Sequence, residues 1–131
     1  MQEFSKYARV PYVPMGKDTN GWDCTGLVRY VLRERFGVET PDYSFLYRGE
    51  DCIQTSDFER ELLTWRRVAA EEMPGDVLFL MVLGLPHVAL VTGGGYMLHA
   101  RKKMGTLHEP YRTTYWLRRI QGAFRWPTMG A

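Results

Sequence analysis

The chain has 131 residues, the usual size of one domain, and we expect residues 1–131 to form a single domain. Hydrophobic residues make up 45% of it and charged residues 24%, a composition that excludes an intrinsically disordered protein. The longest apolar run, residues 77–83, is far shorter than the roughly 20 residues that a membrane span needs. Two cysteines, at positions 24 and 52, are too few for a disulfide framework.

The net charge of +2 is unevenly distributed. Residues 1–100 carry 10 Lys or Arg against 14 Asp or Glu, whereas residues 101–131 carry 7 Lys or Arg and a single Glu. The basic segment at residues 101–131 is either a docking surface for an acidic partner or a solvated surface without a partner. We expect neither nucleic-acid binding nor membrane insertion.

The first half of the chain predicts helices. One helix follows Asp23, its N-cap, and ends at Gly37, which suits the left-handed C-terminal position. Its buried stripe, at the three-and-four spacing of a helix, is Leu27, Val28, Val31, Leu32 and Phe36. A second helix is expected near residues 57–66, with Ser56 and Glu59 as a capping box.

The second half predicts short strands joined by tight turns. The wholly apolar residues 77–82 suit a buried strand, and glycine-rich turns delimit further strands at residues 87–91 and 96–100. Additional strands are expected near residues 112–117 and 120–126. Helices followed by a meander of short strands indicate an α+β fold with an antiparallel sheet.

Cys24 is the first candidate for chemistry. It follows the capping Asp23 and opens a helix, so its sulfur lies among unpaired N–H groups at the positive end of the helix dipole. This environment stabilises a thiolate, which a nucleophilic cysteine needs. The alternative is a small buried hydrophobic residue, the more common role of a single cysteine.

His87 and His99 strengthen the catalytic interpretation. If a hairpin of odd loop length is centred on Gly93, the two histidines lie opposite each other on one face of the sheet. One imidazole would then accept the proton of Cys24 while the other orients it, as in a catalytic triad. A two-residue loop would place them on opposite faces. With ordinary histidines, activity should fail below about pH 5–6.

A cysteine and two histidines could also bind zinc. No CxxC or HExxH spacing accompanies them, so we expect no zinc. His108 is expected in an exposed charged loop, and Cys52 between the two predicted helices has no histidine nearby in the sequence.

Four motifs occur in an order that resembles the NlpC-like cell-wall peptidases. They are residues 21–28 (GWDCTGLV), 74–79 (PGDVLF), 87–91 (HVALV) and 96–100 (YMLHA), and the resemblance covers residues 5–126. It implies a papain-like fold in which the nucleophile helix packs on an antiparallel sheet. It also implies a cysteine endopeptidase, without metal or cofactor, that hydrolyses amide bonds in peptidoglycan stem peptides.

The resemblance also implies roles for individual residues. Cys24 matches the nucleophile, His87 the base, and His99 the residue that orients the base. Tyr12 matches a tyrosine that supports the oxyanion; the alternatives are Tyr7 in that role or a packing role for Tyr12. The family commonly has a glycine pair after this tyrosine, whereas residues 13–16 here are VPMG, which leaves the peptide preference open.

The N-terminal residues contain no apolar core of the kind that a secretory signal peptide requires. We therefore expect synthesis in the cytoplasm without a signal peptide, and delivery to the bacterial cell wall as a component of a phage or phage-like tail. Tail-tip proteins would dock on the basic segment at residues 101–131, with Trp116 and Trp126 available to them. The alternatives are a structural tail-tip or assembly protein with an occluded or idle site, and a cytoplasmic amidase.

Overall fold

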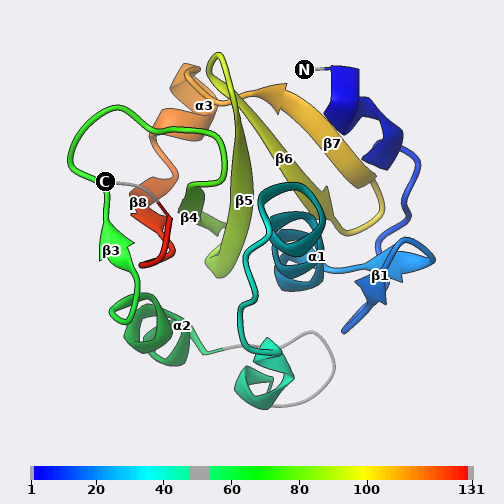
Figure 1. Ribbon diagram of the computed structural model, residues 1–131, viewed down its shortest axis with the longest axis horizontal. Coiled ribbons are helices and arrows are strands. Elements are labelled where there is room, and N and C mark those ends of the chain that lie inside the picture. The colour runs from blue at the N-terminus through cyan, green and yellow to red at the C-terminus, as the bar shows by residue number, and fades with distance from the viewer. Residues whose placement is uncertain (1, 48–53, 130–131) are drawn as a thin grey trace.

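A computed structural model describes residues 2–47 and 54–129 of the chain (Figure 1). No helix in these two stretches is long and apolar enough to span a membrane. The elements are, in chain order, the 3-10 helix η1 (Gln2–Tyr7), β1 (Lys17–Asp18), β2 (Gly21–Trp22), α1 (Cys24–Phe36), the 3-10 helix η2 (Tyr43–Leu46), α2 (Thr55–Leu62), β3 (Arg66–Arg67), β4 (Val77–Val82), β5 (Leu85–Gly93), β6 (Tyr96–Arg101), β7 (Gly105–Pro110), α3 (Thr114–Leu117) and β8 (Ile120–Arg125).

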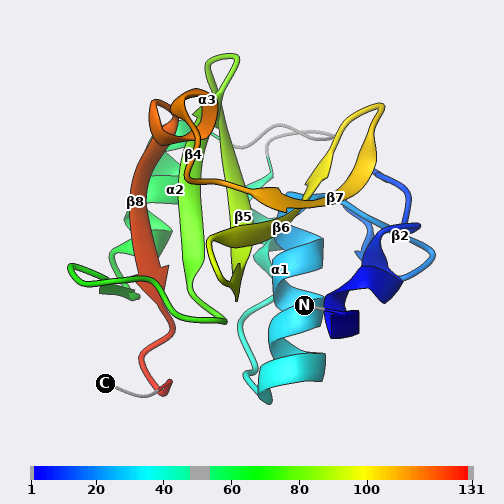
Figure 2. The same ribbon diagram turned by 90° about the horizontal axis from the view of Figure 1, so that it is seen from above.

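The main sheet has six strands in the order β3-β8-β4-β5-β6-β7, and every neighbouring pair is antiparallel. Figure 2 shows that the sheet is strongly curved, with β6 and β7 bending around α1. Side chains of α1 and α2 pack on one face, and Trp116 of α3 packs on the other. This arrangement confirms the predicted α+β, papain-like fold with the nucleophile helix on an antiparallel sheet.

The helix α1 has the predicted ends. The Asp23 side chain accepts a hydrogen bond from the Gly26 backbone N–H, and Gly37 closes the helix in the left-handed conformation. The helix also approaches the backbone of the preceding loop closely, because a Cβ on Gly26 would lie 2.0 Å from the carbonyl oxygen of Gly16. Only glycine fits at this third position of α1 without a shift of the loop.

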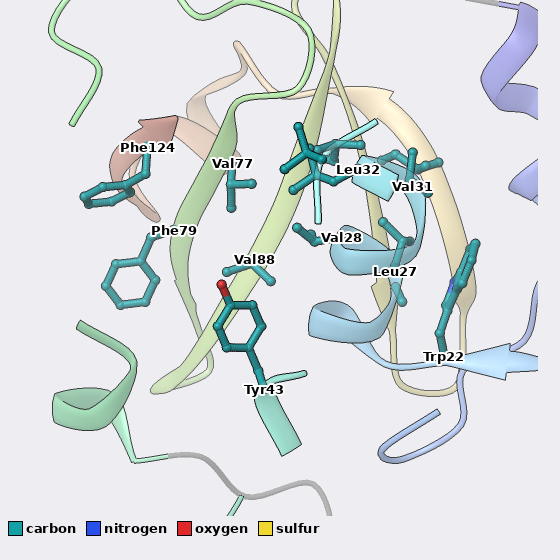
Figure 3. Packing of buried hydrophobic residues seen from close by; sticks show 14 of the residues in the cluster. Trp22, Leu27, Val28, Val31, Leu32, Tyr43, Val77, Phe79, Val88 and Phe124 are labelled. Atoms are coloured by element: carbon teal, nitrogen blue, oxygen red, sulfur yellow. The ribbon is translucent and has the colours of Figure 1, made fainter. Parts of the chain in front are cut away.

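The larger core lies between α1, α2 and the sheet (Figure 3). The predicted apolar stripe of α1 is buried from Leu27 to Leu32, whereas Phe36 at its end is only half-buried. Figure 3 shows the buried part facing the strands that carry Val77 and Val88. Phe58 of α2 stacks on Phe79 of β4, with ring centroids 5.5 Å apart. This packing fixes the N-terminus of α1 relative to the strands.

The second helix differs from the prediction. It spans Thr55–Leu62, begins after Gln54, and receives no side-chain hydrogen bond at its N-cap. Ser56 therefore lies inside the helix, and the expected capping box with Glu59 was wrong. The buried face of α2, Phe58 and Leu62, explains why tertiary packing outweighs the capping signal.

The C-terminal strands were predicted correctly at residues 120–126 but wrongly at residues 112–117. The latter region forms the short helix α3, where the Thr113 side chain accepts a hydrogen bond from the Trp116 backbone N–H. The strand beside β6 is instead β7, which the sequence analysis missed. Because β7 is at the edge of the sheet, it tolerates polar residues and ends at Pro110, so it has no apolar signature.

Candidate active site

Cys24 and His87 line the same cleft, which has a volume of about 370 Å³. The cleft lies between the N-terminus of α1, the β4–β5 turn and the β6–β7 turn. Tyr12 and Tyr47 are also on its wall, and residues 101–103 (RKK) make one side of it basic. The fold therefore brings the predicted nucleophile, base and oxyanion tyrosine to one opening.

The thiol side of the cleft, which we define as Asp23, Cys24, Thr25 and Tyr47, is organised by the Asp23 carboxylate. Besides the Gly26 N–H at 2.9 Å, this carboxylate accepts hydrogen bonds from the Thr25 hydroxyl at 3.2 Å and from the Tyr47 hydroxyl. The Asp23 side chain is buried and bonded on both oxygens, so it fixes the start of α1. Cys24 is the first residue of α1, where unpaired helix N–H groups favour a thiolate.

Tyr47 is a cleft residue that the sequence analysis missed. Burial raises the pKa of its hydroxyl, and the nearby Asp23 and Cys24 raise it further, so it stays a neutral donor. It lies 23 residues beyond Cys24 in a segment without helical or strand periodicity. The sequence therefore contains no pattern that predicts a contact between Tyr47 and the start of α1.

A bulge in β5 places His87 and His99 on the same face of the sheet. Gly93 pairs with Tyr96 across a two-residue loop, and this register alone would put the histidines on opposite faces. The register then shifts at Thr92, an extra residue in β5, and the shift of one returns the two histidines to one face. The predicted common face is correct, although the predicted odd-length loop is not.

The two histidines are diagonal neighbours, not directly opposed as predicted. Beyond the bulge Leu90 pairs with Leu98, and continuing this register by one residue places His99 beside Ala89. His87 lies two residues before Ala89, which is within reach of a long side chain on the same face. Direct opposition across Gly93 was therefore wrong.

The imidazole side of the cleft, which we define as His87, His99, Glu109 and Trp116, is a chain of hydrogen bonds. Nε2 of His87 lies 2.8 Å from Nδ1 of His99, and Nε2 of His99 lies 2.7 Å from a carboxylate oxygen of Glu109. The other Glu109 oxygen accepts a hydrogen bond from the Trp116 indole N–H at 3.3 Å. His87 therefore has only Nδ1 left to act on a group in the cleft.

Burial makes both histidines neutral. It lowers the pKa of His87 to about 3, assisted by the neighbouring His99 and Arg101, and it lowers the pKa of His99 to about 3, assisted by Arg101. The folded protein therefore keeps a neutral imidazole pair well below the pH 5–6 limit that ordinary histidines would set. The acid limit of activity near pH 5–6 was expected from histidines without burial, and it stays a prediction.

The remaining candidates lie apart from this chain of bonds. His108 is in β7 and not in an exposed loop; its ring lies 2.7 Å from the Thr92 hydroxyl and packs against Phe4 and Tyr96. Cys52 is outside the described residues. In the part of the chain that the structure describes, no three His, Cys, Asp or Glu side chains gather as ligands for a metal ion.

The C-terminal segment is less available for docking than the sequence indicates. Trp116 is buried, with its ring edge-on to His99 at 5.2 Å between centroids, and Trp126 packs against Trp65. Arg125 forms a buried, two-bond ion pair with Asp76 at 2.7 and 2.8 Å. The prediction that Trp116 is open to a partner was wrong, because this residue supports the site itself.

Comparison with known proteins agrees with this geometry. Residues 9–125 match the model of the NlpC/P60 family. The chain is similar to gamma-DL-glutamyl hydrolase of Bacillus subtilis, with 26% identity over 98% of this chain and 29% of the relative. It is also similar to murein DD-endopeptidase MepS/murein LD-carboxypeptidase of Escherichia coli, with 26% identity over 95% of this chain and 60% of that protein.

The fold comparison gives the same result. The NlpC/p60 domain of the peptidoglycan hydrolase SagA superimposes with a TM-score of 0.62 and 27% identity, covering 94% of this chain and 92% of that domain. The chain spans less than two thirds of the length of the two hydrolases above, and it corresponds to nearly the whole of this single domain. With the family match extending from residue 9 to residue 125, the chain belongs to the NlpC/P60 family.

Proposed function

We propose that this chain is a cysteine peptidase that hydrolyses amide bonds in the stem peptides of peptidoglycan. The observation that carries the proposal is one cleft lined by Cys24, at the N-terminus of α1, and by His87, whose far nitrogen is hydrogen-bonded to His99. Membership in a family of cysteine peptidases that act on peptidoglycan supports the same chemistry.

The proposed reaction is acyl transfer through a thioester. The Cys24 thiol gives its proton to Nδ1 of His87, and the thiolate attacks the amide carbonyl. The backbone N–H of Cys24 and the hydroxyl of Tyr12 stabilise the oxyanion. His87 then protonates the leaving amine, and a water molecule, deprotonated by His87, releases the acid product.

The names of the relatives support peptide and amide substrates of more than one kind. One relative is named a gamma-DL-glutamyl hydrolase, and another is named both a DD-endopeptidase and an LD-carboxypeptidase. The proposal therefore names the substrate class and leaves the identity of the scissile bond to experiment.

The test is digestion of purified peptidoglycan by the wild-type protein and by Cys24→Ala, with mass spectrometry of the released fragments. The proposal predicts new stem-peptide termini with the wild type and none with Cys24→Ala, because loss of the nucleophile lowers kcat by roughly 10⁶-fold. A matched control is the Glu71→Ala variant, which removes an exposed ion-pair partner of Arg112 that does not line the cleft. Absence of new termini with the wild type would contradict the proposal and favour an idle structural protein or an amidase with another substrate.

Delivery to the cell wall by a phage or phage-like tail is a separate proposal. Its support is the basic segment at residues 101–131, in which residues 102–103 are exposed at the rim of the cleft. The measurement is detection of the protein in purified particles by mass spectrometry. Its presence only in the host cytoplasm would contradict tail delivery and leave the proposed reaction unaffected.

A further inference from the structure

We propose that Glu109 is a positioning residue that fixes the tautomers of His99 and His87, and thereby leaves Nδ1 of His87 unprotonated toward Cys24. The inference rests on the proposed function of the cleft. Glu109 belongs to β7, the edge strand that has no counterpart among the sequence motifs, and its side chain reaches His99 from outside the cleft lining.

The starting point is an ambiguity in the histidine pair. A neutral imidazole has one N–H and one acceptor nitrogen, so a bond between two neutral rings can run in either direction. If His87 donates from Nε2 to Nδ1 of His99, then Nδ1 of His87 is a base. If His99 donates instead, Nδ1 of His87 carries the proton and the pair has no base for the thiol.

Glu109 resolves this ambiguity because an ionised carboxylate only accepts hydrogen bonds. At 2.7 Å from Nε2 of His99, it requires the N–H of that ring to be on Nε2. Nδ1 of His99 is then an acceptor, so Nε2 of His87 must donate across the 2.8 Å contact. The lone pair of His87 therefore points to the cleft.

The surroundings hold Glu109 in this role. The Trp116 indole donates to its second oxygen, and the Trp116 ring lies perpendicular to His99 with centroids 5.2 Å apart. His99 is fully buried, whereas the Glu109 side chain is 33% exposed. The register places Glu109 two residues beyond Leu107, the partner of His99, on the same face of the sheet.

The carboxylate also supports the charged intermediate. When His87 takes the Cys24 proton, it becomes an imidazolium that still donates from Nε2 to His99, and Glu109 stabilises the positive charge through that ring. An amide at position 109 would have an N–H₂ group able to donate to His99, which favours the reverse direction of both bonds.

The direct test is ¹⁵N NMR of the histidine rings in the wild-type protein at neutral pH, which distinguishes protonated from unprotonated ring nitrogens. The chain has only three histidines, so single His→Gln variants assign the signals. The proposal predicts N–H on Nε2 of both His87 and His99, with Nδ1 unprotonated in both. N–H on Nδ1 of His87 would overturn it. This measurement needs no substrate, so its outcome is independent of whether peptidoglycan is cleaved.

The matched variants are Glu109→Gln and Glu72→Gln. Glu72 also accepts a hydrogen bond from an aromatic side chain, the Tyr111 hydroxyl, but lies outside the cleft and the histidine chain. For Glu109→Gln we expect kcat to fall by about 10²–10⁴-fold with little change in KM, and N–H signal to move to Nδ1 of His87. Glu72→Gln should change neither.

A purely structural role for Glu109 would give a different result. It would lower the melting temperature and leave both the tautomers and the kcat of the remaining folded enzyme unchanged, which would overturn the proposal. If Glu109→Gln does not fold, the wild-type ¹⁵N spectrum alone decides the outcome.

Discussion

The two sides of the cleft are built in different ways. The thiol side is local: Asp23, Cys24 and Thr25 are consecutive, and one carboxylate orders the start of α1. The imidazole side is assembled from β5, β6 and β7 and from Trp116 of α3, and it depends on a strand register, a bulge and an edge strand. The proposed nucleophile is thus positioned by helix capping, whereas its proposed base is positioned by the whole sheet.

This difference has energetic consequences. The groups of the thiol side have several backbone and side-chain donors around a single carboxylate, so removal of one bond leaves others in place. The imidazole side is a linear chain in which each group has one partner on either side. Among the residues that support Cys24 and His87, we therefore expect changes on the imidazole side to affect catalysis more strongly than changes on the thiol side.

The largest of these effects is expected for His99→Ala. The change removes the acceptor of the buried His87 N–H and leaves the base without orientation, so kcat should fall by about 10²–10⁴-fold. The measurement is the rate of peptide release together with the melting temperature. His108→Gln is the control, because His108 is a half-buried β7 histidine bonded to Thr92 outside the cleft. Equal effects of the two variants on kcat would contradict the specific role of His99 in orienting His87.

The next effect concerns pH and stability. The pKa of His87 and His99 is lowered to about 3 in the folded protein by burial, whereas the unfolded chain has ordinary histidines near 6.5. Below about pH 6.5 the unfolded state therefore binds protons first, and each histidine should reduce the free energy of unfolding by about 1.4 kcal/mol per pH unit until the pH nears the folded pKa.

Urea unfolding at pH 7 and pH 5 measures this effect. Carboxylates titrate in both the wild type and His87→Gln, so a comparison of the two proteins isolates the contribution of His87. Between pH 7 and pH 5 the variant should lose less stability than the wild type. Identical slopes for the two proteins would contradict the burial of a neutral His87.

The smallest effect is expected on the thiol side. Asp23→Ala removes the N-cap of α1 and should lower the free energy of unfolding by about 1–2 kcal/mol, the upper part of the range for a capping residue. Asp42→Ala, which breaks the exposed ion pair with Lys17, should cost less than about 1 kcal/mol. Denaturant unfolding compares the two, and a larger loss for Asp42→Ala would contradict the role of Asp23.

The same contrast explains which features the sequence could predict. The helix α1 and its capping residues Asp23 and Gly37 were correct because capping depends on residues three or four apart. The strands β4, β5 and β6 were also recognisable, since each contains an apolar run bounded by turn residues. Each of these features is determined by residues that lie close together in the sequence.

The remaining features depend on contacts between distant segments. The bulge at Thr92 has no sequence signature of its own, so the prediction had the right face for the histidines and the wrong register. As an edge strand, β7 tolerates polar residues and has no apolar run that would identify it in the sequence. Glu109 was therefore missed together with its strand. Tyr47 was missed because it reaches Asp23 from a segment far along the chain.

The central claim of this account is that Cys24 is the nucleophile and that His87 activates it by taking its proton. The most direct measurement is the rate of Cys24 alkylation by iodoacetamide at neutral pH in the wild type and in His87→Ala, followed by peptide mass spectrometry, with Cys52 as the second thiol of the same chain. The account predicts that Cys24 reacts at least about tenfold faster in the wild type than in His87→Ala, while the rate at Cys52 is the same in both. Equal rates at Cys24 in the two proteins would contradict it.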